Sequence, residues 1–120
     1  MRRVMCTEFG GPERLTTQEG PDPEPGAGEV LVAVEAAGVS FVDGLIVAGR
    51  YQIRPPLPFV PGSAVAGRVA ALGPGVDGPA VGTPVAAAVM DFGGFASHLV
   101  VPVAEVVAVP EGVEAAVAAS

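Results

Sequence analysis

Glycine and proline interrupt this chain so often that long regular elements are excluded. The 120 residues include 17 Gly and 13 Pro, scattered without a fixed period, which argues against a collagen-like repeat. Proline fixes its own φ and disfavours the helical region for the residue before it, while glycine favours turns. Half of the residues are hydrophobic, and the abundant valines favour strands. The sequence therefore predicts short strands joined by many turns.

The hydrophobic stretches between these breaks give the expected elements. Residues 29–38 form the best strand, apolar on both faces at its start, which is typical of a central strand. Ser40 is a suitable N-cap for a short helix at residues 41–48 that Gly49 would end, and a last helix is expected at residues 113–119. The pattern predicts a mainly β fold, a small closed or partly closed β-barrel with one or two short helices. The other expected strands are residues 1–9, 14–19, 63–72, 84–90, 95–101 and 105–109.

Two glycine positions carry more specific expectations. Gly67 lies inside an expected strand, which indicates a β-bulge or a close backbone approach. The run from Gly73 to Gly78 has the glycine spacing of a dinucleotide-binding fingerprint. Pro74 and Pro79 prevent a helix from starting there, so we interpret the run as a turn between strands.

The charge balance and the cysteine count limit the function classes. Thirteen acidic residues against six basic ones give a net charge of −7, and the basic residues are dispersed arginines, so we expect no nucleic-acid partner. No stretch approaches the ~20 apolar residues that span a bilayer, and the amino terminus lacks the apolar core of a signal peptide. Cys6, the single cysteine, cannot form an internal disulfide. These features predict a cytoplasmic protein without a membrane partner.

The sequence gives little indication of a metal site or of a catalytic nucleophile. Cys6 and His98 are the one cysteine and the one histidine, and they fall on separate expected strands, whereas a structural zinc site usually needs four ligands. We therefore expect no metal site. Ser97 precedes His98 directly, and adjacent strand residues point to opposite faces, so we expect no Ser–His dyad. No Gly-x-Ser-x-Gly elbow is present either, which argues against a hydrolase.

Two segments of the chain resemble the medium-chain dehydrogenase/reductase superfamily. They are residues 38–51 (GVSFVDGLIVAGRY) and residues 61–67 (PGSAVAG). Zinc-bearing members place a Cys where Ser40 stands and a His-Glu pair where Ser63 and Ala64 stand. The resemblance therefore points to the zinc-free, quinone oxidoreductase-like branch, and further similar segments follow at residues 81–85, 93–101 and 106–113.

This resemblance covers essentially the whole chain and implies its domain organisation. Residues 1–120 would be the N-terminal GroES-like domain, the catalytic and substrate-facing half of such an enzyme. The Rossmann domain that holds the cofactor would be absent from this chain, so the fragment is expected to be inactive alone.

The resemblance also implies roles for individual residues. Zinc-free quinone oxidoreductases and mitochondrial-type enoyl-thioester reductases carry a Gly-x-Asn-x-x-Asp-x-x-x-x-x-Gly-x-Tyr pattern. Ser40 replaces its Asn, and the matching residues are Gly38, Asp43, Gly49 and Tyr51. Ser40 would lie near the nicotinamide end of NADPH, and Tyr51 would be the catalytic proton donor. On local grounds alone, Ser40 is a helix cap and Tyr51 an amphipathic ring in a loop.

Three further residues would line the substrate cleft: Phe41, Asp43 and Ser63. Local considerations alone make Asp43 a first-turn residue whose charge suits the helix dipole. Val47 stands where many quinone oxidoreductases have Arg, a departure that bears on substrate preference.

The implied activity is hydride transfer from NADPH to a quinone or an α,β-unsaturated carbonyl. One alternative is a fragment of a 2-enoyl-thioester reductase. Another is a stand-alone GroES-like binding module, which a co-chaperonin-like assembly would favour. The implied partners are the small-molecule carbonyl or quinone substrate, a second copy in a homodimer, or a separate chain that carries the cofactor domain.

Overall fold

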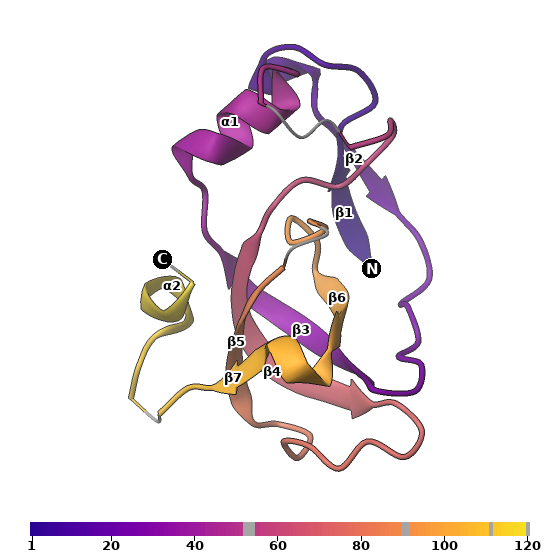
Figure 1. Ribbon diagram of the computed structural model, residues 1–120, viewed down its shortest axis with the longest axis vertical. Coiled ribbons are helices and arrows are strands. Elements are labelled where there is room, and N and C mark those ends of the chain that lie inside the picture. Colours follow the sequence, from indigo (N-terminus) through magenta and orange to yellow (C-terminus); the bar gives the residue numbers. More distant parts are fainter. Residues whose placement is uncertain (52–54, 90–91, 111, 120) are drawn as a thin grey trace.

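The computed structural model describes residues 1–51, 55–89, 92–110 and 112–119. Within these ranges the structure is mainly β with two short α-helices (Figure 1), which confirms the expected fold class. No helix of the described ranges is long and apolar enough to cross a membrane. The elements are β1 Arg2–Met5, the 3-10 turn η1 Pro12–Arg14, β2 Thr16–Glu19, β3 Glu29–Ala37, α1 Phe41–Val47, β4 Ala64–Leu72, β5 Pro84–Ala88, β6 His98–Pro102, the 3-10 turn η2 Val103–Glu105, β7 Val106–Ala108 and α2 Ala115–Ala118.

Each expected strand overlaps an observed one, but several boundaries differ. The strand expected from residue 14 begins at Thr16, because Pro12 opens a 3-10 turn that includes Arg14. The strand expected from residue 95 begins at His98, and the last helix is limited to Ala115–Ala118. Met90, the expected end of the fifth strand, lies outside the described residues.

Antiparallel pairing organises the strands into two sheets. β1 and β2 form a hairpin, as expected across the turn at Pro12. The other five strands form one sheet in the order β6-β3-β4-β5-β7. β3 pairs with both β4 and β6, which confirms that it is a central strand. Its first residues, Val30, Leu31 and Val32, are all buried, as their apolar character on both faces predicted.

The five-stranded sheet must curl, because its two edge strands are joined by a very short connection. β6 and β7 lie at opposite edges, and only η2 links them. A flat sheet of five strands would separate its outer strands by about 19 Å, since neighbours lie ~4.8 Å apart. The four peptide steps from Pro102 to Val106 can span at most about 14 Å. Because β6 and β7 do not pair with each other in the described part of the chain, the barrel is partly closed and the closed alternative is wrong.

Aliphatic side chains from four strands and one loop fill the inside of the curled sheet. The core cluster consists almost entirely of valine, the residue whose abundance predicted strands. Small branched side chains suit a tightly curved sheet because they leave room for the opposite wall. The members of this cluster are Val30, Val32, Val65, Val69, Val85, Ala87, Val89 and Val101.

Gly67 allows β3 and β4 to approach each other at a β-bulge. The register between the two strands shifts between Val34 and Ala36, so Glu35 is the extra residue. A Cβ built on Gly67 would lie 2.0 Å from the Ala33 carbonyl oxygen. Both features that Gly67 led us to expect, a bulge and a close approach, are therefore confirmed.

A second glycine, Gly38, lies directly against the end of the chain's last helix. A Cβ on Gly38 would meet the Ala119 carbonyl oxygen at 2.5 Å, and the Gly38 amide donates to the Ala64 carbonyl at 2.9 Å. Figure 1 shows α2 beside the end of β3, next to the connection that leads to α1. The segment that carries Ser40 therefore begins at a close contact with the C-terminal helix.

Gly67→Ala should destabilise the domain by more than about 2 kcal/mol, because backbone that cannot yield occupies the position of the new methyl group. Urea unfolding followed by circular dichroism measures the loss. Gly20→Ala is the matched control, since nothing lies within 4 Å of a Cβ at Gly20. Equal stability of Gly67→Ala and Gly20→Ala would contradict the close approach.

Candidate functional site

The beginning of α1 is held by a reciprocal capping box between Ser40 and Asp43. The Asp43 amide donates to Ser40 Oγ at 3.4 Å, and the Ser40 amide donates to Asp43 Oδ2 at 2.8 Å. The Ser40 hydroxyl donates to the same Oδ2 at 3.2 Å. Ser40 is therefore the N-cap, as predicted. Gly49, with φ of 73°, takes up the left-handed conformation that follows the helix.

Asp43 is buried rather than exposed in the first turn. Only 3% of its surface is accessible. Among the described residues, Asp43 is the one polar or charged residue that is buried. Oδ2 receives both donors from Ser40, whereas Oδ1 is buried without a hydrogen-bond partner among the described residues. A bare carboxylate oxygen in the interior is costly, more so than a neutral acceptor. This makes Asp43 the most unusual polar group of the fold.

An apolar pocket of about 310 Å³ lies against this helix start, and both Ser40 and Asp43 line it. The remaining walls are almost entirely apolar and come from α1, from the η1 region and from the loop before β6. An apolar cavity with very few polar groups is typical of a small-molecule site. The other lining residues are Pro12, Leu15, Val39, Gly44, Leu45, Val47 and Phe95.

The structure brings only part of the predicted site together. Tyr51 is half-buried in the bend after α1, and Ser63 is half-buried just before β4. Neither lines the apolar pocket. Phe41 opens α1, but its side chain lies outside the described part of the structure. The roles assigned to Tyr51, Ser63 and Phe41 stay predictions.

Several walls of the pocket were not found by sequence reasoning. Leu15 is a single apolar residue in a polar stretch, and Phe95 follows two glycines. Both reach the pocket through long-range folding, since the hairpin and the loop before β6 meet beside α1. An isolated antiparallel bridge between Arg3 and Ala96 joins β1 to the loop before β6. No local spacing could have indicated it.

The described residues contain no group of three or more His, Cys, Asp or Glu side chains that could hold a metal ion. Cys6 is completely buried, and its thiol donates to the Glu8 carbonyl at 3.3 Å. Burial raises the pKa of the Cys6 thiol. The residue thus has the surroundings of a small buried hydrophobe, as its sequence context indicated.

The expectation that Ser97 and His98 point apart is wrong. Ser97 Oγ lies 3.0 Å from His98 Nδ1, because Ser97 occupies a bend just before β6, where strand alternation does not apply. Ser97 Oγ also accepts from the Arg2 amide at 2.8 Å. Asp22 approaches the same Nδ1, at 3.8 Å. A catalytic triad needs the nucleophile and the acid on different ring nitrogens, so this cluster is not one.

Asp22 instead anchors the amino terminus. The Met1 ammonium lies 2.9 Å from Asp22 Oδ1 and also donates to the Gly20 carbonyl. The hydrogen bond from this ammonium lowers the pKa of Asp22, and the nearby His98 contributes in the same direction. The loop that follows β2 is thereby tied to the start of β1.

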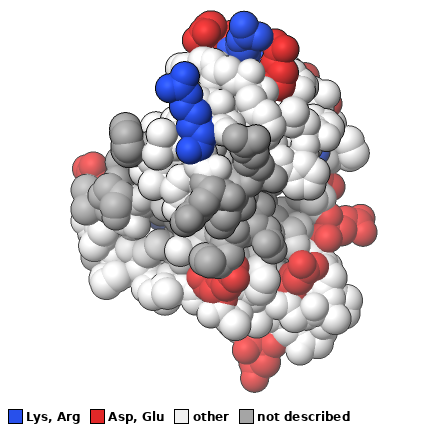
Figure 2. Space-filling model, turned by 45° about the horizontal axis from the view of Figure 1, so that its top comes forward, with Lys and Arg blue, Asp and Glu red and all other residues white. Residues whose placement is uncertain are grey.

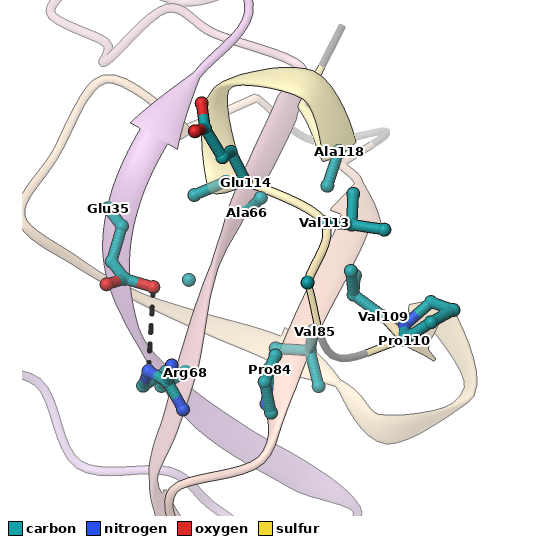
Figure 3. Close-up of a pocket in the computed structure, with 13 residues that line it drawn as sticks. Glu35, Ala66, Arg68, Pro84, Val85, Val109, Pro110, Val113, Glu114 and Ala118 are labelled. Atoms are coloured by element: carbon teal, nitrogen blue, oxygen red, sulfur yellow. Dashed lines mark ion pairs between the residues drawn. The ribbon is translucent and has the colours of Figure 1, made fainter.

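A second pocket, of about 450 Å³, lies between the sheet and the segment that leads to α2 (Figure 3). Glu35 and Arg68 form an ion pair at its edge, with 3.8 Å between Oε1 and Nε, and both side chains are about half exposed. Glu114, from the segment that leads to α2, also lines this pocket. Ser40, Asp43, Tyr51 and Ser63, the predicted site residues whose side chains are described, do not line this pocket, so the candidate site is the smaller one beside α1.

Acidic and basic side chains are dispersed over the surface. Figure 2 shows acidic side chains scattered over the face that carries the α1 end, with basic side chains between and beside acidic ones at its top. Among the described residues, three arginines form exposed ion pairs, which are worth little individually. The pairs are Arg2 with Glu19, Arg14 with Glu8, and Arg68 with Glu35.

The curled valine-rich sheet and the short capped helix form the GroES-like domain fold of the medium-chain dehydrogenase/reductase superfamily. The chain belongs to the alcohol dehydrogenase GroES-like domain family, whose model matches residues 26–111. Its relatives place it in the branch of quinone oxidoreductases and VAT-1-like proteins.

Three comparisons illustrate this relationship. The quinone oxidoreductase-like protein 2 homolog of Nematostella vectensis is 36% identical over 105 residues, which are 84% of this chain and 27% of that protein. The human synaptic vesicle membrane protein VAT-1 homolog-like protein superimposes with a TM-score of 0.93 at 34% identity, covering 99% of this chain and 38% of that one. Escherichia coli quinone oxidoreductase complexed with NADPH gives 0.92 at 29% identity, covering 99% and 36%.

The chain therefore spans about a quarter to two fifths of the length of these relatives. Its similarity to them is a similarity to one of their domains.

Asp43→Ala should loosen α1, because the Ser40 amide loses its acceptor, at a cost of about 1 kcal/mol. Amide hydrogen exchange at Ala48, which donates to the Gly44 carbonyl inside the helix, measures the effect. Asp43→Asn keeps an oxygen acceptor and should retain most of the protection. Equal exchange in the parent and in Asp43→Ala would show that the cap contributes nothing.

Asp22→Asn should lower stability near neutral pH and lose this effect in acid. The folded pKa of Asp22 lies below its ordinary value, so its contribution is complete above about pH 4 and disappears as pH falls through the folded pKa. Thermal unfolding of both proteins across this range measures the difference. Asp77→Asn, at another exposed aspartate, controls for the lost charge, and a difference that grows in acid would refute the assignment.

Proposed function

We propose that this chain is the substrate-facing domain of a zinc-independent, NADPH-dependent oxidoreductase that reduces quinones or α,β-unsaturated carbonyls. One observation carries the proposal. Ser40, which the family resemblance places near the nicotinamide end of the cofactor, lines the same apolar pocket as the buried Asp43. The resemblance independently assigns Asp43 to the substrate cleft. The NADPH-complexed E. coli quinone oxidoreductase, which has the same fold, supports the choice of cofactor.

The described residues suit one end of such a cofactor. Ser40 is exposed at the pocket, and the neighbouring Val39 is 81% exposed, so a flat ring would meet an apolar wall with a hydroxyl beside it. The described residues do not offer a comparable site for the phosphates of NADPH. The run from Gly73 to Gly78 is a turn between β4 and β5, as predicted, and not the strand–turn–helix that holds a pyrophosphate. NADPH, when bound, would supply the hydride, with its phosphates held by another domain or chain.

This chain's own contribution would be orientation, exclusion of water and proton transfer. The apolar walls of the pocket would keep water from the acceptor. Holding the acceptor in a fixed orientation would lower the entropy cost of the reaction. Ser40, Ser63 and Ala64 stand where zinc-bearing members have their Cys, His and Glu. Tyr51 is then the residue that would donate a hydrogen bond or a proton to the acceptor.

Exposed apolar side chains support the existence of a covering partner. Val39, which lines the pocket, is 81% exposed, and Val42 of α1 is 37% exposed. Such a patch is typical of a surface that another domain or protein covers. We therefore propose a cofactor-binding domain, in the same or a separate chain, or a second copy of this domain as the partner.

A chimera tests this function directly. Residues 1–120 replace the matching domain of E. coli quinone oxidoreductase, and NADPH oxidation is followed with a quinone as acceptor. Quinone-dependent oxidation is expected, whereas a folded but inactive chimera would contradict the proposal. Preference for crotonyl-CoA over quinones would instead favour the enoyl-thioester reductase. The unfused chain serves as control, and calorimetry should detect no NADPH binding to it.

Tyr51→Phe in the active chimera should lower turnover about 100-fold, the low end of what a positioned proton donor contributes. Val107→Thr, at an exposed residue of β7, is the control and should leave turnover unchanged. If Tyr51→Phe retains full turnover with several acceptors, Tyr51 is not the donor.

A further inference from the structure

The ring of Phe95 borders both the apolar pocket and the backbone that leads to Ser63. Phe95 lines the pocket, and a Cβ built on Gly62 would lie 2.7 Å from the Phe95 Cδ1 atom. The amide and the carbonyl of Phe95 are both bound elsewhere. Because the walls of the pocket are almost entirely apolar, Phe95 contributes its ring to them and not its backbone.

The main chain around Phe95 is held on two sides. Its amide donates to the Pro61 carbonyl at 2.9 Å, and its carbonyl accepts from the Val4 amide at 2.8 Å. The preceding residue, Gly94, donates to the Gly62 carbonyl at 3.0 Å. With the backbone fixed in this way, only rotation about the side-chain torsions can move the ring. The fold therefore sets the position of this wall before any ligand arrives.

Ser63 lies beside the pocket but does not line it. The Gly38 amide donates to the Ala64 carbonyl at 2.9 Å, which joins the two segments that carry the predicted site residues. Val39, the residue after Gly38, lines the pocket, whereas Ser63, the residue before Ala64, does not. The ring of Phe95, which packs on Gly62, is the side chain of the pocket wall that reaches this second segment.

We propose that Phe95 limits the size of the acceptor that the pocket admits, and that its ring separates Ser63 from a bound acceptor. The choice of quinones as acceptors rests on the proposed function. A cavity of about 150 Å³ accommodates benzene, so the pocket of about 310 Å³ accommodates two fused rings. A third ring needs the space that the ring of Phe95 fills. Phe95 is then a specificity residue, and it takes no part in the chemistry.

Two quinones that differ by one fused ring test this inference on the 120-residue chain. They are 1,2-naphthoquinone and 9,10-phenanthrenequinone. Covalent addition is limited, because the chain contains no lysine and its single cysteine, Cys6, is completely buried. Amide shifts of Gly44 and Leu45, two pocket residues, report binding in two-dimensional NMR. The quantity compared between proteins is the ratio of the two affinities, three-ring over two-ring.

Phe95→Ala should raise this ratio about tenfold or more over that of the parent chain, the usual lower limit for a size change in an apolar pocket. The vacated space then holds the third ring, which in the parent stays outside the pocket. Phe95→Leu keeps a shorter apolar wall and should give an intermediate ratio, so the test does not depend on the folding of the alanine variant. Exchange of the Ala48 amide verifies that α1 is intact in each variant.

Phe59→Ala is the matched control. Phe59 is also a half-buried phenylalanine, but it does not line the apolar pocket. Its replacement removes a ring of the same size and should leave the ratio unchanged. A rise of equal size in Phe59→Ala would show that general loosening of the domain admits the third ring, and it would overturn the inference.

The Ser63 amide reports the second half of the inference. 9,10-Phenanthrenequinone should shift this amide in Phe95→Ala, because no ring then lies between Ser63 and the ligand. 1,2-Naphthoquinone should leave it unshifted in the parent. A raised ratio without a shift at Ser63 would overturn the separating role of the ring.

The remaining outcomes distinguish this inference from the proposed function. An unchanged ratio in both Phe95 variants, with shifts at Gly44 and Leu45, overturns the size limit and leaves the proposed function standing. If neither quinone shifts these two amides in the parent, the pocket is not the acceptor site and the inference fails with it. The chimera still decides whether the domain supports quinone reduction.

Discussion

The shortness of the connection between β6 and β7 governs the architecture of this domain. Three residues of η2 join strands that lie at opposite edges of a five-stranded sheet. Because they cannot reach across a flat sheet, the sheet wraps around a core made of small branched side chains. Valine serves here both as a strand former and as a filler that tolerates curvature. The hairpin and α1 are then placed at one end of the wrapped sheet (Figure 1).

At that end, the carboxylate of Asp43 both caps α1 and lines the apolar pocket. Asp43 fixes the start of α1 through Oδ2, so its position is set by the fold. The same rigidity holds Oδ1 in place without a partner in the described part of the chain. Unsatisfied buried polar groups are uncommon in native proteins, and strain, a catalytic role or a bound water or ion accounts for those that occur. In this domain the two residues of the helix cap, Ser40 and Asp43, thus also line the apolar pocket.

The order of the strands and the two helices could be predicted because each depends on local signals. Valine-rich stretches, the Ser40 cap and the Gly-Pro turns all act within a few residues of themselves. The walls of the pocket could not be predicted in this way. Leu15 and Phe95 are about 80 residues apart in the chain, and they share the pocket only because of the way the sheet curls. The contact between Ser97 and His98 likewise depended on a bend that strand periodicity does not foresee.

The contact between Gly38 and Ala119, the last described residue, couples the position of α2 to that of the segment before α1. The Ala119 carbonyl rests where a side chain of Gly38 would be, two positions before Ser40. A tilt of α2 toward the sheet would therefore displace the backbone that leads to Ser40, the N-cap of α1. Because Gly38 has no side chain, no flexible group lies between the two segments. A movement of α2 and a movement of the backbone just before the N-cap of α1 would therefore be directly coupled, through a contact between main-chain atoms.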